Sequence, residues 1–505
     1  MGISTSPTGE AMLVIRSASA SPVRWSPRSM ANIRMVHSRM GRTSGGRPVM
    51  MRLCVMMMCA CLFGGPAFAQ DQTEGVPVER DTRFDATLAE IAERLETCTD
   101  DNYESMIEYI KSKEQEGFFA NYQDPDGMTL LMHACRIPET HEIAWWLVYH
   151  RRVDRSIRDD DGMLAWHHTA YNPDAHVASR IVGVFLHWGD DPKSRDGSGR
   201  DFLMHTIIAN HARGLVSLAI DAMDATDEDL NRLDDNGHSA VSYAAMQNHR
   251  FRIWELLAEH GADLSKTYTK DELTPLHLAV RDNMAEVAGA IIREGAEVDA
   301  RDAKGMTPLM WALLQNKDPL MPRYLLQGGA DVTLTNNAGA TMTHAAAYGG
   351  QNADVFKRIL DAGAAPDAPM PNNPTVTPAR LYAQHGDDPV VWSLLGEHGA
   401  DLNRKGEYEP PTLMVAIDRG VSVEYAAAMI DAGCDVNDLW EVANSSALLM
   451  ACRGSSPEMI TMLLDHGADA SLVSVEGKGA LDYAALNPKL KDHPVLERMR
   501  AMVGG

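Results

Sequence analysis

Apolar positions in the second half of the chain follow a repeating order of two short stretches and a glycine. The clearest example begins with residues 274–280, which read TPLHLAV, continues with the apolar stretch 287–292 and closes at Gly295. The apolar residues recur at the three- and four-residue spacing of a helix that buries one face. The pattern therefore predicts pairs of short helices joined by tight turns.

The same order of residues recurs with a period of about 35. The motif that begins at Thr274 begins again 33 residues later at Thr307 and 34 residues after that at Thr341. The closing glycine recurs independently, and from Gly261 to Gly467 its spacing is always 34 or 36 residues. Two separate markers with one period indicate a tandem repeat. The third motif position is occupied in turn by Leu131, Trp166, Leu203, Val241, Leu276, Leu309, Thr343, Ala379, Leu413, Leu448 and Leu481.

This pattern resembles the ankyrin repeat, whose unit has a TPLH helix start, a second helix and a closing glycine. The resemblance covers roughly residues 120–500 and is sharpest from His260 to Asn403. It implies an all-α fold class, an ankyrin-repeat α-solenoid of about eleven helix-turn-helix units with short hairpin loops and helical caps. Bacterial ankyrin proteins serve as inhibitors, immunity factors or stress-associated scaffolds, so the resemblance also implies binding to another protein.

The chemistry of the motif predicts where its helices begin and end. The Thr274 hydroxyl can accept a hydrogen bond from the first free amides of a helix, and Pro275 suits the first helical position. Gly295 can end the second helix in the left-handed conformation that bulky residues resist. One small residue per unit lets neighbouring helices approach closely: Ala244, Ala279, Ala312, Ala346, Ala416, Ala451 and Ala484.

One unit is too small to bury its apolar face alone, so the array needs capping segments at its ends. The amphipathic stretches 84–97 and 105–113 predict two helices ahead of the first repeat. The predicted boundaries are a flexible linker over 70–83, an N-terminal helical cap over 84–120, repeats over 121–478 and a C-terminal cap repeat over 479–505.

Residues 1–69 differ in chemistry from the rest, because they hold eight arginines and a single acidic residue. Within them, residues 50–69 combine a basic flank, a short apolar run, a Gly/Pro break and small residues at Ala67 and Ala69. This order is typical of a secretory signal peptide with an A-x-A cleavage site. We therefore expect cleavage near Ala69/Gln70 and a periplasmic or secreted bacterial protein.

An uncleaved membrane anchor is the alternative, but Gly64, Gly65 and Pro66 interrupt the apolar run before the ~20 residues that a bilayer span needs. The mature chain is therefore expected to have no stable membrane insertion. A lipoprotein cysteine at Cys61 fits the preceding residues poorly. Residues 1–49 form a basic leader without apolar periodicity, and the true translation start could be a later methionine: Met40, Met50 or Met51.

The chain of 505 residues has 46 basic and 70 acidic residues, which gives a formal net charge of -24. A surface this acidic repels phosphate backbones, so nucleic acid is not expected as a partner. Hydrophobic content of 45% is enough for a large core and argues against disorder. Four cysteines follow the signal without CxxC spacing and are predicted to be small buried thiols: Cys98, Cys135, Cys434 and Cys452.

Catalytic motifs are missing from the sequence, which has no GxSxG, HExxH, Walker loop or GxGxxG after a strand. We therefore predict a protein that is not an enzyme and uses no cofactor, although a site hidden in the irregular units 120–260 stays open. The turns 124–127 and 159–162 are similar to calcium loops but place a histidine where an EF-hand needs glutamate. We expect these acidic tips to be solvated hairpins.

Histidines suggest a second function. The TPLH slot holds His167, His277 and His344, where the resemblance implies an imidazole that bonds backbone groups of adjoining loops. One position later, on consecutive units, lie His133, His168 and His205. This ladder would bind zinc or copper if all three faced one groove, although a buried, satisfied histidine is commoner. With the methionines it defines the alternative of a periplasmic metal-binding or redox-protective protein.

Methionine replaces the TPLH histidine in four units, and these residues are predicted to belong to the core: Met132, Met204, Met310 and Met414.

The leading hypothesis is a monomeric scaffold that binds an unidentified, acid-tolerant or basic protein surface. A stacked solenoid presents a long concave surface made of its hairpin tips and the exposed side of each first helix. Specificity then depends on the variable tip positions and on those two and three residues after the repeated alanine, where Tyr, Met and Arg can anchor an interface. The predicted partner-binding residues are Tyr171, Met246, Gln247, Lys270, Asp271, Arg281, Asp282, Lys304, Leu314, Gln315, Asn337, Tyr348, Gln384, Asp418 and Arg453.

Overall fold

The computed structural model divides into two compact units, Met1–Glu79 and Arg80–Gly505. In the first unit, strands β1 (Ser4–Thr5) and β2 (Ala11–Met12) pair antiparallel. The predicted leader, signal peptide and linker otherwise lie outside the described residues. The structure describes residues 4–5, 11–12, 85–98, 102–115, 120–138, 140–149, 153–209, 213–247, 252–315 and 319–503.

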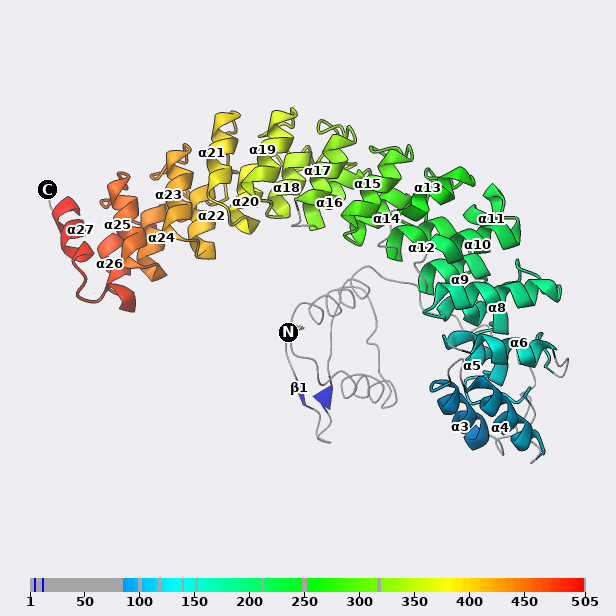
Figure 1. The fold of residues 1–505 in the computed structure, drawn as a ribbon. Coiled ribbons are helices and arrows are strands. Elements are labelled where there is room, and N and C mark those ends of the chain that lie inside the picture. Colours follow the sequence, from blue (N-terminus) through cyan, green and yellow to red (C-terminus); the bar gives the residue numbers. More distant parts are fainter. Residues whose placement is uncertain are drawn as a thin grey trace. The chain divides into compact units, whose positions relative to one another are not determined.

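Helix pairs make up the second unit and follow one another in chain order (Figure 1). Its elements are α3 (Asp85–Leu95), α4 (Tyr103–Gln115), α5 (Leu130–Arg136), α6 (His141–Tyr149), α7 (Ala165–His168), the 3-10 helix η2 (Thr169–Tyr171), α8 (Ala175–His187), α9 (Phe202–Ala209), α10 (Arg213–Met223), α11 (Asp227–Asn231), α12 (Ala240–Gln247), α13 (Arg252–Glu259), α14 (Pro275–Arg281), α15 (Ala285–Arg293), α16 (Pro308–Gln315), α17 (Leu320–Gln327), α18 (Met342–Tyr348), α19 (Ala353–Asp361), α20 (Pro378–His385), α21 (Val390–Glu397), α22 (Thr412–Arg419), α23 (Val423–Asp431), α24 (Ala447–Gly454), α25 (Pro457–Asp465), α26 (Ala480–Ala484), η3 (Pro488–Leu490) and α27 (Val495–Val503).

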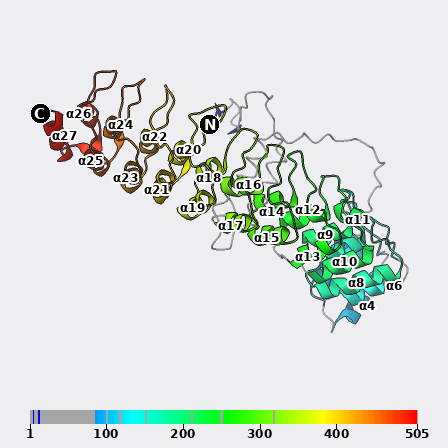
Figure 2. The same cartoon turned by 90° about the horizontal axis from the view of Figure 1, so that it is seen from above.

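Two layers of helices run along this unit. The first helices contact one another in the order α5, α7, α9, α12, α14, α16, α18, α20, α22, α24 and α26, and second helices such as α13, α15 and α17 do the same. From α12 to α25 the first helices lie on the inner side of the row in Figure 1, and Figure 2 shows the hairpins projecting on one side of both layers. The predicted all-α ankyrin-repeat solenoid is therefore confirmed.

Local chemistry begins and ends these helices as the sequence predicts. The Thr274 hydroxyl accepts a hydrogen bond from the backbone N–H of His277 at 3.4 Å, and Pro275 is the first residue of α14. Gly295 follows α15 with a φ of 92°, in the left-handed region that favours glycine. All seven repeated alanines are buried. The apolar core lies between the two layers and continues from unit to unit, as nearest-neighbour stacking requires.

The helices predicted at both ends are present. The stretch 84–97 contains α3, and the stretch 105–113 lies within the longer α4; their buried residues include Leu88, Ile91 and Ile110. At the C-terminal end, η3 and α27 follow α26. After α10 the chain reaches Asp224, which has a φ of 45°, and an additional helix α11 precedes the next hairpin. This repeat therefore departs from the pattern at the place where no closing glycine follows its second helix, α10.

The structure bears on the predictions for the cysteines and for membrane insertion. The four cysteines after the predicted signal are buried thiols, as predicted, and burial raises the pKa of Cys434 and of Cys452 to about 12. Among the described residues, no helix has the length and apolar character needed to cross a bilayer.

Buried amide side chains connect neighbouring first helices. Asn172 donates from Nδ2 to the carbonyl of Ile137 at 2.8 Å, and Gln351 donates from Nε2 to the carbonyl of Leu313 at 2.7 Å. Each amide reaches the end of the first helix in the preceding unit, where carbonyls lack helical partners. These contacts position one unit on the next.

Candidate functional site

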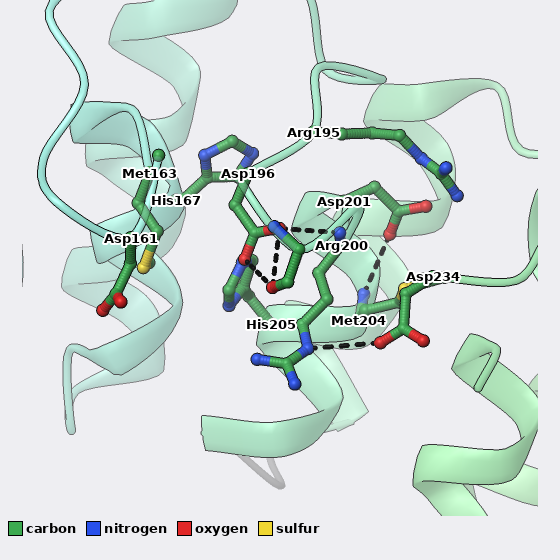
Figure 3. Close-up of polar contacts among 12 residues, drawn as sticks. Asp161, Met163, His167, Arg195, Asp196, Arg200, Asp201, Met204, His205 and Asp234 are labelled. Atoms are coloured by element: carbon green, nitrogen blue, oxygen red, sulfur yellow. Dashed lines mark hydrogen bonds and ion pairs between the residues drawn. The ribbon is translucent and has the colours of Figure 1, made fainter. Parts of the chain in front are cut away.

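An aspartate organises the hairpin of five units: Asp124, Asp159, Asp196, Asp234 and Asp302. In the hairpin before α9, Oδ1 of Asp196 accepts the backbone N–H of Ser198 at 2.9 Å and of Arg200 at 2.8 Å. Its second oxygen, Oδ2, accepts from Nε2 of His205 at 3.1 Å (Figure 3). Nδ1 of the same imidazole accepts from the hydroxyl of Tyr171 in the preceding unit at 3.0 Å. One carboxylate therefore joins the hairpin to the helix that follows it.

The position nine residues after this aspartate supplies a donor in other units too. Nε2 of His133 lies 2.8 Å from Oδ2 of Asp124, and Nε2 of His168 lies 2.8 Å from Oδ2 of Asp159. Tyrosine and tryptophan take the same place elsewhere, in the pairs Tyr243–Asp234 at 2.6 Å and Trp311–Asp302 at 2.9 Å. Because an indole is no metal ligand, the shared role is to hold the hairpin.

The aspartate contacts bear on the two interpretations of the histidine ladder and correct one expectation about the acidic tips. The ladder of His133, His168 and His205 does not form a joint metal site, because within the described part of the chain no three His, Cys, Asp or Glu side chains gather as ligands. The acidic turns 124–127 and 159–162 are solvated only in part, since Asp126, Asp160 and Asp161 are exposed but the side chain of Asp159 is only 5% exposed. Both outcomes have one physical cause, the pairing of each of these aspartates with a donor nine residues away.

The electrostatics favour an ionised carboxylate at Asp196 and a neutral imidazole at His168. Burial opposes ionisation of Asp196, but the hydrogen bonds from His205 and from the Arg200 amide outweigh it and lower the pKa of Asp196. Burial likewise lowers the pKa of His168, although its bond to Asp159 acts in the opposite direction. We call the hydrogen bond between such an aspartate and the side chain nine residues later the clamp. It is therefore already formed at neutral pH.

The TPLH histidines bond backbone groups of adjoining loops, as the resemblance implied. Nδ1 of His344 accepts the backbone N–H of Thr341 at 3.3 Å, and Nε2–H donates to the carbonyl of Val376 in the next hairpin at 3.1 Å. His277 repeats this arrangement. Met132 keeps the first half of it, because its sulfur accepts the N–H of Thr129 at 3.3 Å. All four methionines of this slot are buried, as predicted.

We expect His167→Met to flatten the acid side of the stability curve. Burial, helped by the neighbouring imidazole of His205, lowers the pKa of His167 to about 3, whereas an unfolded histidine titrates near 6.5. Between these values the unfolded chain gains a proton that the folded chain does not. The free energy of unfolding therefore falls with decreasing pH, by about 1 kcal/mol per unit below pH 6 from this group.

Urea unfolding at pH 7, 6, 5 and 4, followed by far-UV circular dichroism, measures this difference. Methionine is the matched replacement because it fills the same buried slot in other units. The exposed His176 on α8 provides the control, and His176→Met should leave the pH dependence unchanged. Parallel curves for the wild type and His167→Met would contradict the prediction.

The inner face, meaning the hairpin tips and exposed sides of the first helices, carries the predicted partner-binding residues. Tyr348 at the end of α18 is 56% exposed, and its ring lies 4.6 Å from that of His385 at the end of α20. Arg281 is half-buried and forms an ion pair with Asp282 at 3.1 Å. The predicted residues that are clearly exposed are Lys270, Asp271, Lys304, Gln315, Asn337, Tyr348, Gln384, Asp418 and Arg453.

Adjacent hairpin tips are tied together through their backbones. The N–H of Ala303 donates to the carbonyl of Asp271 at 2.9 Å, and the N–H of Asn337 donates to the carbonyl of Lys304 at 3.0 Å. The structure thus brings Asp271, Lys304 and Asn337 onto consecutive tips of one row. A partner would meet these side chains on a preorganised ladder.

Other predicted residues are less available. Tyr171 is half-buried and bonded to His205, while Met246 and Leu314 are half-buried against the core. The side chain of Gln247 lies outside the described residues. Two inner-face residues escaped the sequence analysis: His385, and Arg419, which donates to the carbonyl of Gly386 and lies 5.4 Å from the ring centre of Tyr425. The position three after the repeated alanine, applied to every unit, selects Arg419.

A hollow of about 490 Å³ lies among the irregular units, where a hidden enzyme was left open. Its polar groups are engaged with one another: Arg155 pairs with Asp190 at 2.7 Å, and the Trp166 indole donates to Ser194 at 3.0 Å. The Ser156 hydroxyl donates to Oδ1 of Asp154 at 2.6 Å, but the same oxygen accepts the Ser156 backbone N–H at 2.9 Å, so this contact belongs to a local turn. This hollow therefore supplies no argument for catalysis.

A sequence model of ankyrin repeats, in three copies, matches residues 265–336. The chain is an ankyrin-repeat protein. The matched segment begins in the hairpin before α14 and ends at Asn336 in the hairpin before α18. The same stacking of helices continues on both sides of it. The family therefore accounts for the helix pairs, the TPLH histidines and the hairpins described above.

Relatives share this repeat over part of their length. The chain is 27% identical over 235 residues to E3 ubiquitin-protein ligase KEG of Arabidopsis thaliana, which covers 44% of this chain and 14% of that protein. It is 26% identical over 284 residues to ankyrin repeat and KH domain-containing protein mask-1 of Caenorhabditis elegans, covering 50% and 11%. The nuclear factor NF-kappa-B p105 subunit of Gallus gallus is 32% identical over 121 residues, covering 23% and 12%. The chain thus spans about an eighth of these proteins.

Proposed function

We propose that this ankyrin-repeat protein is a non-enzymatic scaffold that binds another protein on its inner face. The main support is the row of exposed variable positions on consecutive first helices and tips, beside alanines that are fully buried. Stacking buries the alanine side of each first helix and leaves the variable side exposed to a partner. Tyr348, with an exposed ring beside His385, has the chemistry of an interface anchor.

We propose further that the scaffold lies in the bacterial cell envelope. There it acts as a monomer in an inhibitory, immunity or stress-associated role. The basic flank, apolar run and A-x-A site of residues 50–69 support export. Mass spectrometry of the protein from periplasmic and cytoplasmic fractions tests this placement. A periplasmic chain that begins at Gln70 would support it, and a full-length cytoplasmic chain would oppose it.

Replacing Arg281 and Tyr348 together by alanine should weaken the complex at least about ten-fold, because aromatic and arginine anchors contribute most to interface affinity. The partner is first captured from an envelope extract by the wild-type chain and identified by mass spectrometry. Isothermal titration calorimetry with the purified partner then compares the chains. Helical content should not change, since neither side chain belongs to the core.

Arg323→Ala combined with Lys357→Ala is the matched control. Both residues are exposed on second helices, away from the inner face, and the double variant should bind like the wild type. Unchanged affinity of the Arg281/Tyr348 variant would count against the inner face.

A further inference from the structure

A patch of aromatic side chains lies on the second-helix layer rather than on the inner face. Trp145 and Tyr149 on α6 are 46% and 57% exposed, and their rings stack with centres 5.0 Å apart. Tyr149 also meets Trp188, just after α8, edge to face at 6.3 Å. We call Trp145, Tyr149 and Trp188 the aromatic patch. Exposed aromatic groups in contact with one another are a common sign of an interaction surface.

Stacking of the repeat does not require these aromatic residues. Trp145 and Tyr149 are the fifth and ninth residues of α6. The fifth and ninth residues of α19, another second helix, are Lys357 and Asp361, which form an ion pair at 3.0 Å. A solvated ion pair at the same place maintains the fold equally well. The aromatic side chains therefore need an explanation outside the fold.

A hollow of about 370 Å³ adjoins the patch between α4 and α6. One group of its lining residues is apolar or aromatic: Tyr103, Ile107, Trp145 and Trp146. The charged lining residues are Glu104, Glu108, Glu142 and Lys111. Carboxylates thus outnumber basic groups three to one around this hollow, next to indole rings.

A cation already occupies part of this environment. The ammonium of Lys111 pairs with Glu108 at 2.7 Å and lies 6.0 Å from the ring centre of Trp146. An aromatic face and a carboxylate together favour a positive charge. Glu104 and Glu142 extend the same negative field toward the exposed Trp145. Glu142 also accepts Arg180 at 3.4 Å, so this rim tolerates guanidinium as well as ammonium.

We propose that the hollow and the aromatic patch bind a segment of a partner protein in which a lysine or arginine stands beside an apolar residue. The cation lies between the carboxylates and the indole rings, and the apolar side chain packs on Trp145 and Tyr149. The net charge of -24 adds a long-range attraction for a basic segment. The same carboxylates disfavour an anionic lipid surface. This site is separate from the inner face.

Four labelled peptides of nine residues test the proposal with the full chain. They differ only in two central residues, which are Leu-Arg, Leu-Glu, Ser-Arg or Ser-Glu, and their binding is measured by fluorescence anisotropy. The Leu-Arg peptide should bind at least ten-fold more tightly than each of the others. Trp145→Ala should weaken its binding about ten-fold, and Glu104→Gln with Glu142→Gln about five-fold.

Matched variants separate this site from the rest of the surface. Lys357→Ala, at the corresponding position of α19, should leave peptide binding unchanged. The Arg281/Tyr348 double variant should also bind the peptide normally, so failure of this site and failure of the inner face are distinguishable. Far-UV circular dichroism shows whether a loss of binding comes from misfolding. The conservative Glu→Gln variants add a second check, because they retain every aromatic ring.

Four results would overturn the proposal. Equal binding of the Ser-Arg and Leu-Arg peptides would reduce the effect to net charge. Equal binding of the Leu-Glu peptide would remove the role of the carboxylates. Unchanged affinity of Trp145→Ala would exclude the aromatic patch. Sedimentation with phosphatidylcholine vesicles that is lost in Trp145→Ala would assign the patch to membranes instead.

Discussion

Replacing Gly349 by alanine should lower the free energy of unfolding by about 3 kcal/mol. Gly349 follows α18 with a φ of -71°, which any residue adopts, so the backbone conformation carries no penalty. The added Cβ would collide with the backbone carbonyl oxygen of Leu313 at the end of α16. That oxygen also accepts the buried amide of Gln351 at 2.7 Å. The first helices therefore cannot separate without losing a buried hydrogen bond.

Gly183 provides the matched control for this steric argument. It lies within α8, and no described atom comes within 4 Å of a Cβ built on it. Alanine there should raise the free energy of unfolding by about 0.5–1 kcal/mol, because it favours the helix over the unfolded chain. Urea unfolding followed by far-UV circular dichroism measures both variants. Similar effects at the two glycines would contradict the close approach of α16 and α18.

Removing the carboxylate of Asp196 is expected to have the second large effect. Asp196→Ala should lower the free energy of unfolding by about 3 kcal/mol, since it leaves one buried and two part-buried donors without their acceptor. These donors are the backbone N–H groups of Ser198 and Arg200 and Nε2–H of His205. Because Tyr171 is bonded to the other nitrogen of His205, the loss also loosens the preceding unit.

Asparagine at position 196 separates the contribution of the hairpin hydrogen bonds from that of the bond to His205. Asn336 performs the hairpin role in a later unit, where its Oδ1 accepts the N–H groups of Ala338 and Ala340 at 3.0 and 2.9 Å. Asp196→Asn should therefore recover about half of the stability that Asp196→Ala loses. Chemical denaturation at pH 7.5 compares the two. Equal losses would show that the bond to His205 accounts for the whole effect, and no loss for alanine would refute the clamp.

Much of the candidate inner face followed from the sequence, because helical periodicity places the residue two after a buried alanine toward solvent. Tyr348, Asp418 and Arg453 are exposed for this reason. Gln384 stands two residues after the buried Tyr382, which takes the place of the alanine, and is exposed as well. Tyr171 also fits the pattern, yet its hydroxyl is bonded to His205 of the next unit. Periodicity identifies the side of a helix and says nothing of which neighbour a polar atom meets there.

The amino-acid sequence by itself determined the repeat, its helix boundaries and the buried methionines, because each unit is specified by local caps and glycines and by contacts with its nearest neighbours. Only the tertiary structure decided which polar groups pair between or within units. The sequence left a metal site on the histidine ladder as an alternative to satisfied histidines, and the folded hairpins favour the second because they bring an aspartate to Nε2. The aromatic patch likewise emerged only when α6 and α8 were packed, because Trp145 and Tyr149 have the spacing of buried residues but lie on the exposed side of the layer. Helix starts and ends depend on residues close together in the sequence. The contacts between hairpins and helices depend on distances that exist only after the chain has folded.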